Sequence, residues 1–151
     1  MGNRAVITDN RKKIGVYLHW NGGRDTVEPL LEYMKLRGFR GGDYGYARMC
    51  QVMGNFFGGT LSLGVSAIDN LDMDNGDNGT YIIDEEFNIV GRECFDGVEQ
   101  KDYEFHNMIF AIDKAQPIKE QVFEECNECE IKTDGSKTCS NCEGKGYLRR
   151  K

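Results

Sequence analysis

The stretch AVITDNRKKIGVYLHW, residues 5–20, determines how the fold begins. Two short runs of β-branched and aromatic residues, at 5–8 and 14–20, lie on either side of the polar segment DNRKK. Strand-forming runs that are separated by a short polar segment are typical of a β-hairpin. We therefore expect the chain to start with two antiparallel strands.

Two amphipathic helices are expected after this hairpin. The first ends at Gly38 and has these apolar residues at helical spacing: Val27, Leu30, Leu31 and Met34. Pro29 fits a helix only in the first turn, so Thr26 is favoured over Asp25 as the N-cap. Residues 43–57 repeat the periodicity and form the second predicted helix.

The rest of the chain predicts further strands and helices. Strands are expected at 60–68, 80–84 and 87–93, an amphipathic helix at 103–115 and a short helix at 118–125. An order that is not a repeated strand–helix–strand array indicates the α+β class. We expect a small antiparallel sheet with about three helices in a domain over 1–120, followed by a zinc-binding knuckle over 121–151.

The knuckle is predicted from four of the six cysteines, which follow the spacing C-x2-C-x9-C-x2-C: Cys126, Cys129, Cys139 and Cys142. Each C-x-x-C pair can place two sulfurs on one metal ion, and two pairs complete the tetrahedral ligand set of a structural zinc site. A disulfide, a thioredoxin-type redox motif and an iron–sulfur cluster are weaker alternatives. The lack of an export signal disfavours a disulfide. A thioredoxin-type redox motif has one C-x-x-C pair rather than two, and the short symmetric spacing suits a single ion better than an iron–sulfur cluster. Four thiolates leave no open coordination position, so we expect one structural Zn²⁺ ion.

The second cysteine pair, CSNCEGKG at 139–146, resembles the C-x-x-C-x-G-x-G signature of the zinc region in DnaJ-type co-chaperones. The resemblance covers only these residues and implies a shared knuckle geometry, not chaperone activity. The negative charge of the four thiolates can be offset by three nearby lysines, namely Lys132, Lys137 and Lys145. Cys50 and Cys94 belong to neither pair, and Cys50 is expected to be a buried thiol.

Acidic residues are concentrated in one part of the chain. The net charge is −6, and residues 69–104 contain 12 acidic side chains against only Arg92 and Lys101. Such a region repels bare nucleic acid and is attracted to the basic groove of a protein that binds nucleic acid. A solvated face that keeps the protein in solution is the simpler interpretation of the same residues.

No catalytic arrangement is evident, and we expect a protein that is not an enzyme. The two histidines, His19 and His106, form no recognisable triad with a nucleophile. Residues 74–85 partly match a calcium-binding loop, but Gly76 stands at a ligand position and the flanking segments are predicted strands rather than helices. A wide hairpin loop with Asn-Gly turns explains the same residues.

Several stretches together resemble small bacteriophage and prophage proteins: MGNRAVIT, IGVYLHWNGGRD, YGYARMCQVMGNFFGG, DNGDNGTYII, IVGRE and IDKAQP. The resemblance covers most of residues 1–117. With the four-cysteine tail, the chain is similar to zinc-containing type II-A anti-CRISPR proteins, which inhibit the RNA-guided nuclease of type II CRISPR systems. The resemblance implies stoichiometric binding to the nuclease of the host, in the cytoplasm of an infected bacterium.

The carboxylates that we expect to contact the nuclease belong to the acidic region: Asp72, Asp74, Asp77, Asp84, Glu85 and Glu86. One alternative is an enzyme of unrecognised type. The other is a nucleic-acid-binding zinc ribbon that uses the basic residues Lys145, Arg149, Arg150 and Lys151. The acidic body opposes direct contact with nucleic acid, and no segment is apolar enough over its length to predict a membrane span.

Overall fold

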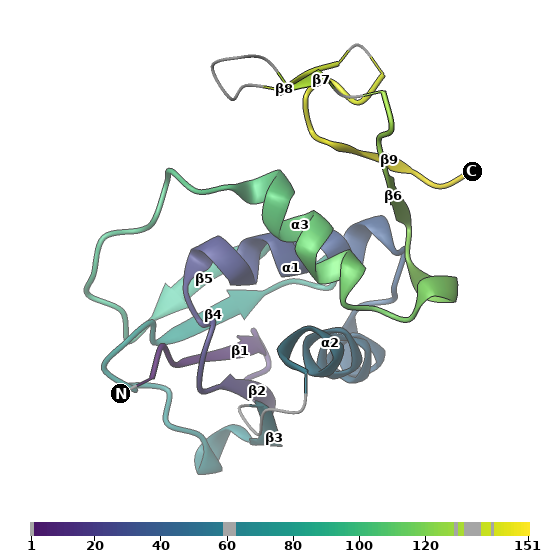
Figure 1. Cartoon of the computed structure of the whole chain (residues 1–151). Helices are drawn as coiled ribbons and strands as arrows, with labels where there is room; N and C mark the ends of the chain where they lie inside the picture. The colour runs from purple at the N-terminus through teal and green to yellow at the C-terminus, as the bar shows by residue number, and fades with distance from the viewer. Residues whose placement is uncertain (1, 59–62, 129, 132–136, 140) are drawn as a thin grey trace.

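The protein is shown in Figure 1 as a computed structural model, which describes residues 2–58, 63–128, 130–131, 137–139 and 141–151. Within these residues it has three α-helices, a five-stranded sheet and two two-stranded sheets near the C-terminus. The predicted α+β class is therefore confirmed.

The main sheet has the strand order β3-β2-β1-β4-β5. Its strands are β1 (Ala5–Asp9), β2 (Ile14–Leu18), β3 (Leu63–Ala67), β4 (Thr80–Ile83) and β5 (Ile89–Glu93). β1 and β2 form the predicted hairpin, with Ala5 opposite Leu18.

The sheet is mixed rather than antiparallel throughout, because β1 and β4 run parallel. The other three neighbouring pairs are antiparallel, as predicted. β3 and β4 consequently point in the same direction, and the chain must return across the sheet between them, through residues 68–79. Local hydrophobic patterns predict strands but not which strands become neighbours, so this parallel pair was missed.

The three helices cover one face of the sheet (Figure 1). They are α1 (Arg24–Leu36), α2 (Gly42–Phe57) and α3 (Phe105–Lys114). Alternate residues of the strands point into a buried core beneath them, among them Ala5, Ile7, Val16, Leu18, Tyr81 and Ile83. None of the helices in the described part of the chain is both long and apolar enough to cross a membrane.

The opposite face of the sheet is covered by residues 68–79, which begin with the short 3₁₀ helix η1 (Ile68–Asn70). A Cβ atom at Gly15 would lie 3.0 Å from side-chain atoms of both Ile68 and Leu71, so the segment packs directly on β2. The Thr80 hydroxyl donates a hydrogen bond to the Met73 carbonyl at 3.1 Å. The loop that carries much of the acidic sequence is therefore part of the fold.

The predicted N-cap Thr26 lies inside α1. The helix begins earlier, after the N-cap Gly23, and Pro29 lies in its second turn. The backbone N–H of Asp25 donates to the side chain of Gln100 at 3.1 Å, so a residue far along the chain satisfies a group at the helix N-terminus. This contact could not be found from the local capping pattern.

The C-terminal segment forms small sheets of its own. After the 3₁₀ helix η2 (Ile118–Glu120), β6 (Phe123–Glu125) pairs with β9 (Tyr147–Arg149), and β7 (Glu130–Ile131) pairs with β8 (Lys137–Thr138). The Tyr147 ring stacks on Phe110 of α3 with the centroids 4.9 Å apart, and its edge-on contact with Phe123 is at 4.8 Å. The apolar core thus continues from the predicted 1–120 domain into the C-terminal segment.

The prediction of a helix over 118–125 is wrong. Asp113 is fully buried near the end of α3, and its carboxylate accepts hydrogen bonds from the backbone N–H groups of Val122 at 2.9 Å and Phe123 at 3.0 Å. The Tyr33 hydroxyl donates to the same carboxylate at 2.6 Å. Because these N–H groups bond to a side chain, the chain leaves the 3₁₀ turn extended and enters β6 rather than continuing as a helix.

Buried tyrosines are expected to make the fold sensitive to alkali. Burial raises the pKa of Tyr33, Tyr46 and Tyr81 above the usual value, and the hydrogen bond to Asp113 adds to the effect at Tyr33. In the unfolded chain these hydroxyls ionise near pH 10, so stability present below about pH 10 is lost as the pH rises above it. We expect the urea midpoint to fall steeply above about pH 10, together with the appearance of tyrosinate absorbance.

The exposed Tyr44 offers a control for this pH dependence. A Tyr44→Phe variant is expected to keep the wild-type dependence of the urea midpoint on pH, because folding buries little of this side chain. A wild-type midpoint that stays constant well above pH 10 would contradict the burial argument.

Candidate metal centre and acidic surface

Three of the four predicted cysteine ligands lie together. The sulfurs of Cys126, Cys139 and Cys142 are all within 4.8 Å of one another, and the Sγ atoms of Cys126 and Cys139 are 3.7 Å apart. A disulfide bond requires about 2.05 Å. Two sulfurs at about 2.3 Å from one tetrahedral ion lie about 3.8 Å apart. The observed separation suits a shared ligand set, and the cluster could hold a metal ion.

The remaining parts of the predicted site fall outside the described residues. These parts are Cys129 and Lys132, and the side chain of Lys137 is likewise not described. Lys145 is described, and its Nζ atom lies 3.8 Å from a carboxylate oxygen of Glu143. The Lys145 ammonium therefore faces a neighbouring acid.

The glycines after Cys142 explain the C-x-x-C-x-G-x-G pattern. Gly144 and Gly146 have φ values of +79° and +84°, a left-handed conformation that glycine adopts without strain. The resulting turn places the N–H of Gly146 3.3 Å from Cys142 Sγ, where it can donate to a thiolate. Backbone donors to coordinating sulfurs orient the ligands and stabilise their charge.

The pairing of β6 with β9 brings the two halves of the cysteine motif together. β6 ends directly before Cys126, and β9 begins directly after Gly146. The N–H of Cys126 donates to the Gly146 carbonyl at 3.0 Å, which continues the ladder to the cluster. Since Tyr147 of β9 packs on α3, a metal ion bound here would fix the C-terminal strand against the body of the protein.

The six carboxylates predicted to bind a partner lie at the two ends of β4. Three precede the strand, namely Asp72, Asp74 and Asp77, and three follow it, namely Asp84, Glu85 and Glu86. Four of them are exposed and their carboxylates make no hydrogen bond or ion pair with the described residues: Asp72, Asp74, Glu85 and Glu86. Asp77 and Asp84 are instead bonded within the protein.

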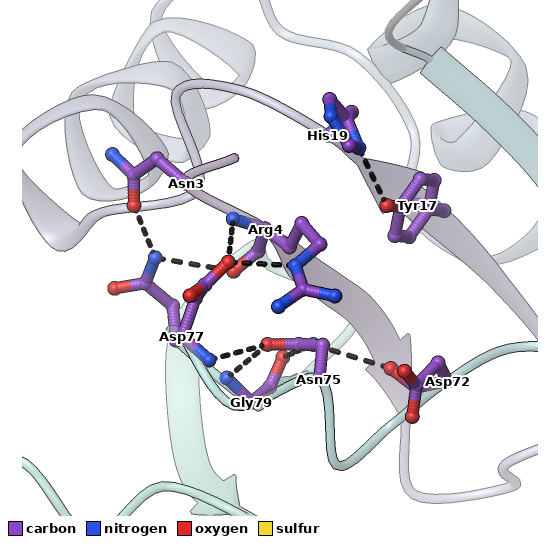
Figure 2. Close-up of polar contacts among 9 residues, drawn as sticks. Asn3, Arg4, Tyr17, His19, Asp72, Asn75, Asp77 and Gly79 are labelled. Carbon is purple, nitrogen blue, oxygen red and sulfur yellow. Dashed lines mark hydrogen bonds and ion pairs between the residues drawn. The ribbon is translucent and has the colours of Figure 1, made fainter. Parts of the chain in front are cut away.

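Asp77 binds Arg4 at the start of the chain, as Figure 2 shows. Its Oδ2 atom accepts hydrogen bonds from Arg4 Nε at 2.7 Å and from the Arg4 backbone N–H at 3.1 Å. These bonds hold the pKa of Asp77 below its usual range and raise the pKa of Arg4. They tie the acidic loop to the entry of β1.

The buried Asn75 side chain organises the rest of this loop (Figure 2). Its Oδ1 accepts hydrogen bonds from the N–H groups of Asp77 and Gly79, and its Nδ2 donates to the carbonyls of Asp72 and Gly79. Within the described residues the carboxylates of this loop do not meet as a metal-binding group. The predicted wide hairpin loop is wrong, because the segment connects β3 to β4, which are not neighbours in the sheet and run in the same direction.

Asp84 stabilises the turn between β4 and β5. Its Oδ1 accepts hydrogen bonds from the N–H groups of Glu86 and Asn88, both at 2.9 Å. Burial acts to raise the pKa of Asp84, but its hydrogen bonds with Asn88 and Glu86 outweigh burial and lower it. The turn is thereby held with Glu85 and Glu86 facing solvent.

Other acids of region 69–104 are neutralised inside the protein. Glu93 pairs with Lys12, and Glu99 pairs with both Arg92 and Arg24. The Arg92 guanidinium lies between the rings of Tyr81 and Phe95, with its carbon 3.8 Å and 4.0 Å from the two centroids. Glu93 and Glu99 are therefore not part of the free negative surface, which includes the two turns that flank β4 and also the exposed Asp69, Asp96 and Asp102.

The residues weighed for catalysis do not assemble into a catalytic group in the described part of the chain. His19 bonds to the Tyr17 hydroxyl at 2.9 Å (Figure 2), and His106 contacts the ring of Phe105. Cys50 is partly buried, and burial raises the pKa of its thiol, which disfavours a nucleophilic thiolate. Cys94 is exposed.

Arg4 and Asn75 were not among the predicted site residues. The sequence NGDNG at 75–79 indicates turns, yet the choice of Asn75 as the buried amide depends on its contacts in space. Nothing local to Arg4 points to Asp77, which lies far along the chain. No protein-family model matches this chain, and no curated protein or solved structure matches it either.

Proposed function

We propose that this protein inhibits another protein by stoichiometric binding, without turnover, and that its target is the RNA-guided nuclease of a bacterial type II CRISPR system. The observation that supports the binding surface is the set of four exposed, unpaired carboxylates at the ends of β4. The resemblance of residues 1–117 to phage proteins supports the choice of target.

The arrangement suits a positively charged groove. The nuclease holds its nucleic acid in such a channel. The two carboxylate pairs, Asp72 with Asp74 and Glu85 with Glu86, belong to the segments before and after β4, a strand about 13 Å long at roughly 3.3 Å per residue. Internal hydrogen bonds of Asp77 and Asp84 hold the two turns in place, so little conformational entropy is lost when a partner binds.

We also propose that the metal held by the cysteines is one structural zinc ion. Zinc accepts four thiolates in a closed tetrahedral site, and the sulfur separation of 3.7 Å supports this geometry. Cys129 is expected to complete the set with Cys126, Cys139 and Cys142. The ion would hold β9 in place and would take no part in chemistry, because no coordination position remains open.

The binding surface is tested with purified nuclease and guide RNA. We expect the wild-type protein to suppress DNA cleavage at a one-to-one ratio. A variant with Asp72→Asn, Asp74→Asn, Glu85→Gln and Glu86→Gln is expected to associate roughly tenfold more slowly at low salt, because electrostatic attraction sets the association rate. The rate is measured by surface plasmon resonance over a range of salt concentrations.

The matched control removes charge elsewhere on the surface. Glu124→Gln with Glu128→Gln neutralises exposed acids outside this region and should associate at the wild-type rate. An equal loss in both variants would show that only net charge matters and would contradict the assigned surface. Absence of binding to the nuclease, or inhibition at catalytic amounts, would refute the proposed function itself.

A further inference from the structure

Four arginines form a second charged surface, which neither the acidic region nor the metal centre includes. We call Arg37, Arg40, Arg48 and Arg149 the arginine surface. Arg37 and Arg40 lie in the loop after α1, Arg48 lies in α2, and Arg149 ends β9. In Figure 1 this loop and β9 lie on the same side of the molecule.

Aromatic rings contact three of the four guanidinium groups. The guanidinium carbon of Arg37 lies 4.8 Å from the ring centroid of Phe39, and that of Arg48 lies 5.8 Å from the same centroid. The guanidinium of Arg40 lies 4.9 Å from the ring centroid of Tyr44. These contacts are cation–π interactions, which use no N–H group. Arg48 Nη1 donates to the Gln51 side chain at 2.9 Å and Arg37 Nη1 donates to the Tyr33 hydroxyl at 3.4 Å, which leaves the other N–H groups of these arginines for a ligand.

Arg149 joins this group from the other end of the chain. Its Nη2 atom donates a hydrogen bond to the carbonyl of Leu36 at 3.1 Å, at the last residue of α1. The C-terminal strand therefore brings a fourth guanidinium next to the loop that carries the first two.

The arginine surface lacks counter-charges. Elsewhere in the described part of the chain Arg4, Arg11, Arg24 and Arg92 all form ion pairs with carboxylates. No carboxylate in that same part pairs with the four members of the arginine surface. The nearest acids by sequence are already engaged, since Asp43 pairs with Arg11 and Glu32 with Lys35.

We propose that the arginine surface binds single-stranded nucleic acid. A planar guanidinium donates two parallel hydrogen bonds to a phosphate, which suits arginine better than lysine for this contact. Aromatic rings beside such groups are platforms on which unpaired bases stack. Tyr44 is 67% exposed, so most of its surface is open to a base. An acidic protein partner would use the guanidinium groups but would gain little from this ring.

The net charge of −6 led to the expectation that nucleic acid is repelled. The turn with Glu85 and Glu86 packs against the loop that carries Arg40, since a Cβ atom at Gly41 would clash with the Glu85 carbonyl oxygen. No carboxylate of the described residues pairs with the four arginines, and the acids that lie more than about 10 Å away are screened at ordinary ionic strength. Binding of nucleic acid by the arginine surface does not depend on the proposed inhibition of the nuclease, and it is measured without nuclease.

The probe is a fluorescein-labelled single-stranded DNA of about 20 nucleotides, longer than the roughly 4–16 nucleotides that small single-strand binders cover. Binding of the full-length protein is followed by fluorescence anisotropy at several salt concentrations. We expect Arg40→Ala with Arg48→Ala to weaken binding roughly tenfold near 0.1 M salt. The slope of log affinity against log salt should fall by about 1.4, which corresponds to the loss of two phosphate contacts.

The control is Lys13→Ala with Lys101→Ala, which removes two exposed positive charges outside the arginine surface. This variant should keep the wild-type affinity and slope. Tyr44→Ala should weaken binding without changing the slope, because stacking involves no counterion release.

Three results would overturn the inference. They are no binding of the oligonucleotide by the wild-type protein, equal losses in the arginine and lysine variants, and binding of poly-L-glutamate as tight as that of the oligonucleotide. The last result would indicate a site for acidic protein instead. Thermal unfolding of each variant is measured in parallel, and a wild-type midpoint ties any loss of affinity to the replaced side chains.

Discussion

Replacing Asp113 with alanine is expected to destabilise the protein by about 3–5 kcal/mol, the largest effect of any single substitution in the main body. The carboxylate is fully buried and accepts hydrogen bonds from the Val122 and Phe123 N–H groups and from the Tyr33 hydroxyl. Its removal leaves three buried donors without an acceptor, each at a cost of about 1–3 kcal/mol before the structure relaxes. Urea unfolding followed by circular dichroism measures the change.

Two further variants separate the parts of this network. Tyr33→Phe removes one donor and leaves both backbone bonds, so a loss of only about 1 kcal/mol is expected. Asp102→Ala removes an exposed carboxylate and should change the stability by less than about 0.5 kcal/mol. If Asp113→Ala were no more destabilising than Asp102→Ala, Asp113 would not be the connection between α3 and β6.

Replacing Cys142 with serine is expected to abolish metal binding and to disorder the segment from β6 onward, while the five-stranded sheet and its helices persist. A hydroxyl is a poor zinc ligand, and the loss of one of four thiolates opens the coordination sphere. Structural zinc sites in small peptides are worth about 10–16 kcal/mol of apparent binding energy, so we expect the C-terminal segment to depend strongly on the proposed ion. Elemental analysis after dialysis should find one zinc per wild-type chain and none per variant chain.

Cys50→Ser is the matched control, because this thiol lies on α2, outside the sulfur cluster. It should keep the full zinc content. Amide hydrogen exchange should show lost protection at β6 and β9 in the Cys142→Ser variant alone. A wild-type protein without bound metal, or full metal retention by Cys142→Ser, would contradict the structural zinc proposal.

The elements of the fold were largely predictable because their signals are local. Two runs of β-branched and aromatic residues on either side of a polar segment predicted the hairpin, and the apolar spacing predicted α1, α2 and α3. The cysteine spacing was equally informative: three of its four members meet in space. Each of these patterns is read within a few residues or from repeated short motifs.

The features that were missed depend on pairs of residues far apart in the chain. Asp113 holds residues 122–123 extended, Gln100 satisfies the start of α1, and Arg4 binds Asp77. The charged surfaces also depend on residues far apart in the chain. The number of acidic residues in the sequence predicted one acidic region, whereas ion pairs in the folded protein neutralise Glu93 and Glu99.

The sequence by itself therefore determined the class of the fold, most of its helices and strands, and three cysteines that lie close together. Only the tertiary structure decided which strands run parallel, which acids remain free and which arginines lack a carboxylate partner. The physical reason is that periodicity and turn propensity depend on neighbouring residues. Charge neutralisation and the satisfaction of buried hydrogen bonds depend instead on which distant groups the fold brings within contact.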